Sequence, residues 1–358
     1  MPNYKERRER LIEKMCEMGI DTIVLAPGPD MTYLTGFREE QSDRPIFLLV
    51  GDGCWLIAPD IYEGQLDTLD PDIEIGIWKE GDPKNSFDLL KSRLKGKTAI
   101  DDRMFFSSFF RMANEFKGGH IYEPASPLIK DMRIIKDPDE IETLRRAGRI
   151  ASDSLRVVWE KIEDGKFEVE IAAEIEYEMR GRGAASLAFE TIATSGPRSA
   201  MPHARASSET IKTNLVLDFG CFYENYASDM TRTFLLGHDE ELERIYGIVK
   251  EAQARAVQSV KDGVKAKEVD QAARSYIEKR GYGDYFYHRT GHGIGLEVHE
   301  RPYITKDSEV VLKEGMAFSV EPGIYLPGRY GVRIEDIVIV TESGCEVLND
   351  FPREMVFL

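Results

Sequence analysis

Four acidic residues interrupt apolar, strand-like runs in the second half of the chain, and this feature restricts the possible folds more than any other. They are Asp218, Asp229, Glu321 and Glu335. Like charges that lie side by side in a sheet repel each other, so such a group needs either protonated carboxyl groups or a cation between them. Folds that leave these acids bare within a sheet are therefore disfavoured.

The spacing within each acid pair predicts a hairpin. Asp218 and Asp229 are eleven residues apart, and a four-residue loop over 222–225 would place them directly opposite each other. Glu321 and Glu335 are fourteen residues apart, and an odd-numbered loop centred on Gly328 would do the same. Two acid pairs at mirrored spacing in apolar strands are not typical of a solvated surface. We therefore predict that the four carboxyl groups meet.

Three histidines fall within twelve residues of the same part of the chain: His288, His292 and His299. Glycines surround His292, as expected where backbone comes close to a ligand or a metal cluster. Their spacing does not fit a nucleotide-binding loop, and the HExxH zinc motif is absent. Four carboxylates and one imidazole are a hard ligand set, which suits Mn²⁺, Co²⁺, Fe²⁺ or Zn²⁺ in a two-metal site.

The chain divides into two predicted domains. Residues 1–127 contain one helix followed by short apolar runs and predict a small α/β domain. Residues 128–137 are expected to form a linker, and residues 138–358 a second domain. This domain begins with a long helix, because Asp137, Pro138 and Glu140 have the pattern of an N-cap, a first-turn proline and a capping box.

The second domain has an internal duplication in its pattern. The order helix, helix, strands occurs twice, and Thr194-Ser195-Gly196 before His203 is echoed by Arg289-Thr290-Gly291 before His299. Both repeats also end in a strand pair that carries two acids. These observations favour a pseudo-twofold domain.

Composition excludes several classes of protein. The 358 residues are 42% hydrophobic and carry a net charge of −17, so nucleic acid is not an expected partner. No apolar run is long enough to span a membrane, and the charged N-terminus lacks the apolar region of a signal peptide. Four widely spaced cysteines without a CxxC pattern are typical of reduced thiols. We expect a globular cytoplasmic protein.

Together these residues resemble the pita-bread metallopeptidases. The matching segments are LDFG with Asp218, SDMTRT with Asp229, TGHGIGLEVHE with His292 and His299, EPGIY with Glu321 and RIED with Glu335. Within that family the chain is most similar to prolidase (Xaa-Pro dipeptidase) and to the short form of Xaa-Pro aminopeptidase, over nearly its whole length. The resemblance implies an α/β fold, in which a creatinase/prolidase-like N-terminal α/β domain precedes a pita-bread (pseudo-twofold α+β) catalytic domain.

The resemblance also implies a role for each acid and for His292. Asp218 would bind one metal ion, His292 and Glu321 would bind the other, and Asp229 and Glu335 would bridge both. Glu321 would in addition act as the general base.

Other positions are implied to contact the substrate or to support the ligands. His203 and His299 match the two auxiliary histidines of the family, which contact the substrate carbonyl and the tetrahedral intermediate. Arg333 and Thr231 lie two residues from ligands on the same strand faces, so they are candidate supports. His288 is a candidate for lining the active site, with simple packing as the alternative.

The sequence departs from the family pattern at three positions that concern the substrate: Pro197, Ala204 and Tyr303. Prolidases often carry an arginine where this chain has Tyr303, and an arginine there would suit a free substrate carboxylate. Arg301 lies two residues past His299, and in a regular strand both would share the active-site face. It is therefore a candidate carboxylate ligand, with a surface salt bridge as the alternative.

The function implied is hydrolysis of the peptide bond before proline by an enzyme with two divalent metal ions, with Mn²⁺ or Co²⁺ favoured over Fe²⁺ or Zn²⁺. Small peptides with proline in the second position are the expected substrates, and a homodimer is the expected assembly. The favoured activity is that of an Xaa-Pro dipeptidase, and the alternative is an Xaa-Pro aminopeptidase that acts on longer peptides. A non-catalytic pita-bread binding protein is a remote alternative, because such a protein would be expected to have lost ligands.

Overall fold

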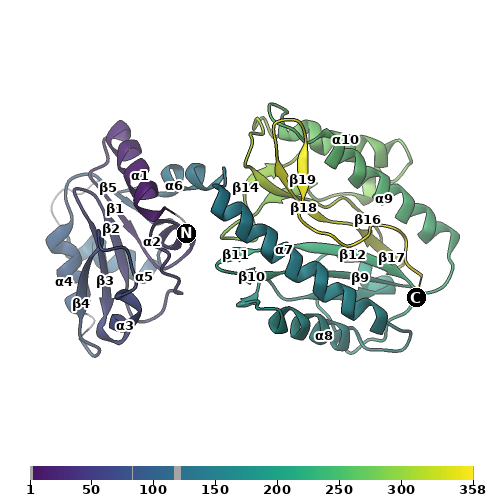
Figure 1. Cartoon of the computed structure of the whole chain (residues 1–358), viewed down its shortest axis with the longest axis horizontal. Coiled ribbons are helices and arrows are strands. Elements are labelled where there is room, and N and C mark those ends of the chain that lie inside the picture. The colour runs from purple at the N-terminus through teal and green to yellow at the C-terminus, as the bar shows by residue number, and fades with distance from the viewer. Residues whose placement is uncertain (1–2, 83, 117–121, 358) are drawn as a thin grey trace. The chain divides into compact units, whose positions relative to one another are not determined.

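The computed structural model describes residues 3–82, 84–116 and 122–357. The chain divides into two compact units, Met1–Arg133 and Ile134–Leu358 (Figure 1). This boundary falls within the predicted linker, but most of that linker belongs to helix α6 (Ser126–Arg133). The helix forms because Leu128, Ile129 and Met132 bury one face. Residues 128–133 of the predicted linker are therefore helical.

The first unit contains a six-stranded sheet with the order β4-β3-β2-β1-β5-β6. As predicted, a helix is followed by short strands, and this first helix ends at Gly19, which has a left-handed conformation. The strands are β1 (Thr22–Leu25), β2 (Phe47–Val50), β3 (Cys54–Pro59), β4 (Glu74–Trp78), β5 (Thr98–Ile100) and β6 (Tyr122–Pro124). The other helices are α1 (Tyr4–Met18), α2 (Pro29–Thr35), α3 (Glu63–Leu66), α4 (Lys84–Arg93) and α5 (Phe106–Glu115).

The second unit repeats the order helix, helix, strands, as predicted. Its first half contains α7 (Pro138–Val158), α8 (Glu168–Gly181), β7 (Ser186–Leu187), β8 (Ile192–Ser195), β9 (Asn214–Phe219), β10 (Cys221–Tyr223), β11 (Tyr226–Ala227) and β12 (Met230–Leu235). Its second half contains α9 (Glu240–Ser259), α10 (Ala266–Glu278), β13 (Gly291–Gly293), β14 (Glu300–Ile304), β15 (Ala317–Val320), β16 (Gly323–Leu326), β17 (Tyr330–Arg333), β18 (Asp336–Val340) and β19 (Cys345–Val347). Figure 1 shows α7 crossing in front of these strands.

Each half has a hydrophobic core of its own. In the first half, Leu155 of α7 and Ile171 of α8 pack with Leu217 of β9. In the second half, Val249 of α9 packs in one cluster with Phe318 of β15. The predicted capping box at the start of α7 is present, because Asp137 and Glu140 exchange side-chain to backbone hydrogen bonds of 2.9 Å. The strands that carry the acids are thus anchored on separate helix pairs.

The hairpin of the first half differs from the prediction. Asp218 pairs with Thr231, and Asp229 lies two residues before Thr231. The two aspartates are therefore not directly opposite each other. The reason is the turn, which contains only Glu224 and Asn225, both with positive φ, instead of the predicted four residues. The shift is by two residues, so a regular strand would still place both acids on the same face.

The hairpin of the second half has the predicted register. Val320 pairs with Asp336 and Gly323 pairs with Arg333, so Glu321 and Glu335 lie opposite each other between the two ladders. The loop contains three residues centred on Gly328, whose φ is 74°. The prediction of an odd-numbered loop is confirmed.

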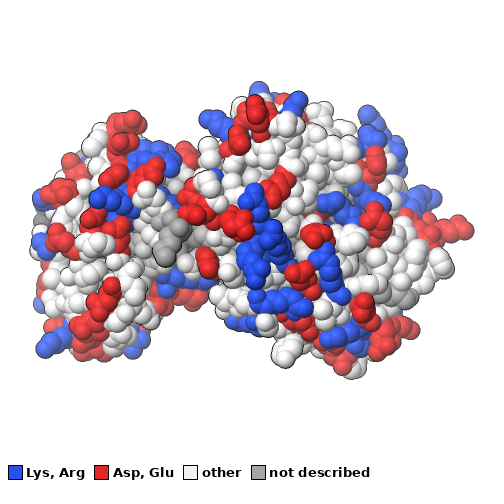
Figure 2. Space-filling model, in the orientation of Figure 1, with Lys and Arg blue, Asp and Glu red and all other residues white. Residues whose placement is uncertain are grey.

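Charged side chains on the surface are largely interspersed. Figure 2 shows basic side chains gathered along α7, with acidic ones beside them. Arg145 of this helix pairs with Glu346 at 2.6 Å, and Arg156 pairs with Asp153 at 2.7 Å. The basic face of α7 is therefore partly neutralised. No helix in the described parts of the chain is both long and apolar enough to cross a membrane.

Candidate metal centre

A cavity of about 380 Å³ opens in the second unit, where strands of its two halves meet. All five predicted ligands line it, together with both predicted auxiliary histidines, His288 and Arg333. The residues that line it are Phe189, Glu190, Ile192, Pro202, His203, Arg205, Asp218, Asp229, His288, Arg289, His292, Val298, His299, Glu321, Arg333 and Glu335. Side chains more than one hundred residues apart in the sequence thus share one site.

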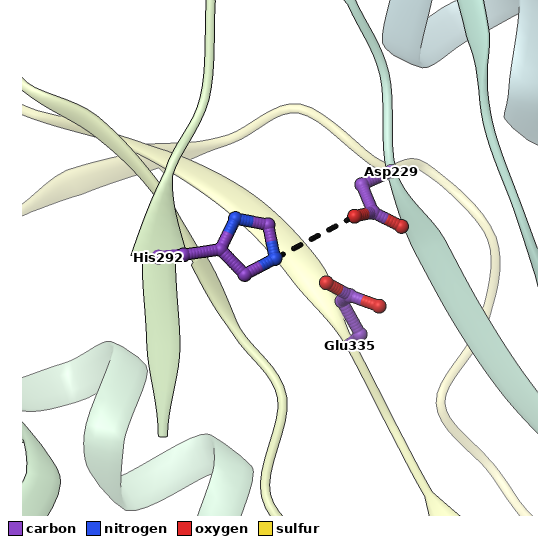
Figure 3. Close-up of side chains that lie close together, drawn as sticks. All are labelled: Asp229, His292 and Glu335. Carbon is purple, nitrogen blue, oxygen red and sulfur yellow. Dashed lines mark ion pairs between the residues drawn. The ribbon is translucent and has the colours of Figure 1, made fainter. Parts of the chain in front are cut away.

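Asp229, His292 and Glu335 form the centre of this site, and Figure 3 shows their side chains pointing toward one another. One potential ligand atom from each lies within 4.8 Å of the others. The Nε2 atom of His292 is 3.7 Å from Asp229 Oδ2 and 3.4 Å from Glu321 Oε1. Its Nδ1 atom lies 3.1 Å from the carbonyl oxygen of Gly293. Because a carbonyl only accepts, Nδ1 carries the proton and Nε2 presents a lone pair to the acids.

Burial determines the electrostatics of these groups. It is the largest cause that raises the pKa values of Asp229 and Glu335 well above their usual range, and neighbouring acids raise them further. Burial also raises the pKa of Glu321 to about 7, against the opposing effect of Arg333. The pKa of His292 is lowered to about 3, again chiefly by burial. The site therefore holds a neutral imidazole among crowded carboxyl groups.

The carboxylate oxygens fit a bound cation. Asp218 Oδ1, Asp229 Oδ1 and Glu335 Oε1 are buried, and none accepts a hydrogen bond from any residue that the structure describes. A buried oxygen without a partner is costly, and a carboxylate oxygen more so than a neutral one. Divalent cations bind such oxygens readily, so the residues present suit a metal centre.

Each half of the second unit supports a ligand of the other half. Arg333 of the second half donates from Nη2 to Asp218 Oδ2 at 2.6 Å and from Nε to Thr231 Oγ1 at 3.1 Å. Thr231 of the first half donates in turn to Glu335 Oε2 at 2.7 Å. Both residues that the sequence suggested as supports therefore contact ligands, although across the two halves.

The two auxiliary histidines lie at the cavity with exposed rings. His299 stands edge-on to His292, with ring centroids 4.2 Å apart. Desolvation and Arg289 lower the pKa of His299. His203 lies in the loop between β8 and β9 and also lines the cavity. Both rings are accessible to a molecule that enters the cavity.

Two family models match the chain. The model of metallopeptidase family M24 matches residues 142–342, and that of the creatinase/prolidase N-terminal domain matches residues 7–135. The chain belongs to metallopeptidase family M24. The predicted family and order of domains are confirmed, and membership implies divalent metal ions at this site.

Known relatives of this M24 peptidase match it over almost its whole length. It is 39% identical to the Xaa-Pro dipeptidase of Pyrococcus furiosus, over 98% of this chain and 100% of the relative. It is similar to the structure of an Xaa-Pro dipeptidase from Bacillus anthracis, with a TM-score of 0.93, 38% identity and coverage of 99% of this chain and 100% of the other. It is also similar to the X-Pro aminopeptidase structure from Thermotoga maritima, with a TM-score of 0.87, 36% identity and coverage of 98% and 99%.

Two residues of the M24 site, Ser319 and Tyr325, were not predicted from the sequence. Ser319 Oγ accepts from the backbone N–H of His292 at 3.0 Å and lies 3.2 Å from Glu321 Oε1, to which it donates. Tyr325 OH accepts from Arg333 Nη1 at 2.9 Å. The available signals were a serine two residues before Glu321 on the same strand face, and a tyrosine in a buried strand whose hydroxyl group needs a partner.

His288 combines both of the roles that were considered for it. It lines the cavity, and its Nε2 atom lies 2.9 Å from Tyr325 OH. Its Nδ1 atom lies 2.7 Å from the carbonyl oxygen of Arg289 and must donate there, so Nε2 accepts from Tyr325. Burial lowers the pKa of His288 to about 3, which favours this neutral form.

The packing of neighbouring strands requires two of the glycines around His292. A Cβ atom on Gly291 would lie 1.8 Å from the carbonyl oxygen of Ser319, and one on Gly293 would lie 2.2 Å from that of Arg301. Both positions therefore need glycine because neighbouring strands approach closely.

Arg301 lies in an irregular part of the sheet. The pairing between β13 and β14 shifts, because His292 pairs with Tyr303 whereas Gly293 pairs with Glu300. The two intervening residues form a bulge, but burial still alternates along β14, with Arg301 and Tyr303 on its exposed side. Arg301 is not among the described residues that line the cavity.

Proposed function

We propose that this M24 peptidase is an Xaa-Pro dipeptidase that hydrolyses the bond before proline with two divalent metal ions. The observation that carries the proposal is the convergence of four acids and His292 on one cavity, with three buried carboxylate oxygens that lack hydrogen-bond partners in the described chain. Full-length relatives named Xaa-Pro dipeptidase, at 38–39% identity, support this substrate class.

In this proposal the ligands divide between two ions. Asp218, Asp229, His292, Glu321 and Glu335 would hold the two ions, with Asp218 on one and His292 and Glu321 on the other. Mn²⁺ or Co²⁺ are the proposed ions, with Fe²⁺ and Zn²⁺ as alternatives that the ligand set also fits. Two such ions polarise a substrate carbonyl and lower the pKa of a water molecule.

The chain's own groups then guide the proton and the substrate. Glu321 lines the cavity and accepts a hydrogen bond from Ser319, which orients its carboxylate as the base that takes the proton of the attacking water. Protonated Glu321 returns this proton to the leaving proline nitrogen. His203 and His299 donate hydrogen bonds to the oxygen on which negative charge develops.

An arginine side chain in the cavity supports a preference for dipeptides over longer peptides. Arg205 pairs with Glu190 and Arg333 with Asp218, whereas Arg289 stacks over the ring of Tyr303 at 4.7 Å. No acidic side chain in the described residues forms an ion pair with Arg289. Stacking leaves the N–H edge of a guanidinium group available, so we assign the substrate carboxylate to Arg289 in place of Arg301.

The experiment that tests the proposed function compares Ala-Pro with Ala-Pro-amide and Ala-Pro-Gly on the metal-loaded enzyme. Ala-Pro should have the higher kcat/KM by about tenfold, because it alone combines a dipeptide with a free carboxylate at proline. A preference for Ala-Pro-Gly would instead support the Xaa-Pro aminopeptidase, which the Thermotoga maritima structure keeps as the second candidate. Absence of hydrolysis with all three compounds would contradict both.

We also propose that the enzyme is a cytoplasmic homodimer. The resemblance to the prolidases supports the dimer, and its test is a molar mass by light scattering of twice that of the chain. The four cysteines are free thiols, which supports a reducing compartment. Small peptides are the proposed partners, and the net charge of −17 argues against nucleic acid.

A further inference from the structure

Glu168, the first residue of α8, is a fully buried carboxylate that holds both ends of one loop. Its Oε1 atom accepts from the backbone N–H of Ser195 at 2.8 Å, where the loop begins. Its Oε2 atom accepts from the backbone N–H of Ser207 at 3.1 Å and from its Oγ at 2.7 Å, where the loop ends. His203 lies between these two serines.

Arg198 adds a link across the same loop. Its Nε atom donates to Glu168 Oε2 at 3.0 Å, which gives the buried carboxylate a counter-charge. Its Nη2 atom donates to the carbonyl oxygen of Arg205, two residues past His203. The segment that carries His203 is therefore fixed before, within and after the histidine by one acid and one arginine.

The His203 ring itself has no such support. It is exposed at the cavity, and no described residue forms a hydrogen bond with it. The position of the ring is therefore set by the backbone of the loop, and the loop is set by Glu168 and Arg198. A small displacement of a group that contacts the reacting atoms can reduce turnover strongly.

We propose that Glu168 is a positioning residue for His203. This inference rests on the proposed function, in which His203 donates a hydrogen bond to the substrate oxygen in the transition state. Glu168 acts through the loop and touches neither substrate nor metal. Its loss should therefore reduce kcat through His203, while the metal ligands stay in place.

The test is a double-mutant cycle between Glu168→Gln and His203→Ala in the manganese-loaded enzyme with Ala-Pro as substrate. The glutamine keeps the shape of the side chain but presents an NH₂ group to donors and leaves Arg198 without its counter-charge. We expect kcat to fall about tenfold with KM changed less than about threefold, and no further loss when Glu168→Gln is added to His203→Ala. Equal losses in both backgrounds would show that Glu168 acts independently and would overturn the inference.

Glu170→Gln is the matched control, because Glu170 is an exposed glutamate of the same helix that caps its N-terminus through Phe167. It should leave kcat unchanged. Arg198→Ala is a second variant for the case in which Glu168→Gln does not fold, since Arg198 is only partly buried. It should lower kcat to a smaller extent, and this loss should also disappear in the His203→Ala background.

A measurement without turnover separates this inference from the proposed function. In zinc-loaded protein with labelled histidine, Glu168→Gln should shift or broaden the Cε1–H resonance of His203 and leave that of the exposed His238 unchanged. An unchanged His203 resonance would contradict positioning by Glu168. If His203→Ala hydrolyses Ala-Pro like the wild type while Glu168→Gln moves the resonance, the role of His203 in the proposed function is wrong, but Glu168 still sets its position.

Discussion

The two halves of the second unit carry equivalent acid pairs but hold them differently. In the second half, Glu321 and Glu335 lie opposite each other in one hairpin, and Ser319 of the same hairpin contacts Glu321. In the first half, Asp218 and Asp229 are offset, and Asp218 is held by Arg333 from the other half. Neither half thus contains a complete site. The metal centre forms only where the two halves meet.

The two halves also differ in what a buried acid behind each repeated motif holds in place. Ser195 and Thr290 occupy equivalent places in the two echoed motifs, and each bonds to a buried acid on the second helix of its half. Glu168 of α8 accepts from the backbone of Ser195, whereas Asp270 of α10 accepts from Thr290 Oγ1 at 2.6 Å. The first acid fixes the loop that carries His203, for which we propose a substrate contact. The second fixes the strand that carries the ligand His292.

Removal of metal should have the largest effect, because the acids of both halves depend on it. Chelation should abolish turnover, and restored activity should rise until two equivalents of Mn²⁺ are bound per chain. Elemental analysis with parallel Ala-Pro assays measures this. Full restoration by a single equivalent would contradict a two-metal site. Full activity of verified metal-free protein would remove the metal mechanism altogether.

The acids of the two halves should differ in their contribution to turnover. Glu321→Gln removes a ligand and the proton acceptor, whereas Asp218→Asn mainly weakens one metal site. At saturating metal we expect Glu321→Gln to lower kcat by about three orders of magnitude or more, and Asp218→Asn by less. Steady-state kinetics over a metal titration distinguishes the two. Near-wild-type turnover of Glu321→Gln would show that the base has been assigned wrongly.

The two histidines that are proposed to contact the substrate, one from each half, should behave alike. His203→Ala and His299→Ala should each lower kcat by roughly two orders of magnitude, because each removes a hydrogen bond to developing charge. Metal content, measured by elemental analysis, should stay at the wild-type value in both. Unchanged kinetics for either variant would restrict that histidine to a packing role. The two halves would then not contribute equivalent histidines to catalysis.

The smallest effect is expected for Asp270, which acts on a ligand only through Thr290. Asp270→Asn should weaken metal binding by about tenfold, as is typical when a group behind a ligand is changed. Its kcat at saturating metal should remain close to wild type, unlike that of Glu168→Gln. Competition with a metal indicator measures the affinity. A loss of kcat at full metal occupancy would show that Asp270, like Glu168, affects turnover and not only metal binding.

The sequence by itself determined the two-part α/β organisation, the duplication in the second unit and the four acids and four histidines that line the cavity. It also determined the register of Glu321 and Glu335, because an odd-numbered loop around Gly328 follows from local spacing. These features depend on periodicity, motif and turn length, which are local properties of the chain.

Only the tertiary structure decided the rest. The two-residue turn at Glu224–Asn225 shifted Asp229 from its predicted partner, and Arg301 is not among the described residues that line the cavity. The contacts of Arg333 with Asp218 and of Glu168 with Ser207 join residues that are 115 and 39 positions apart. No local pattern specifies such partners, because a buried polar group can be satisfied by any donor that the packing of distant strands brings to it.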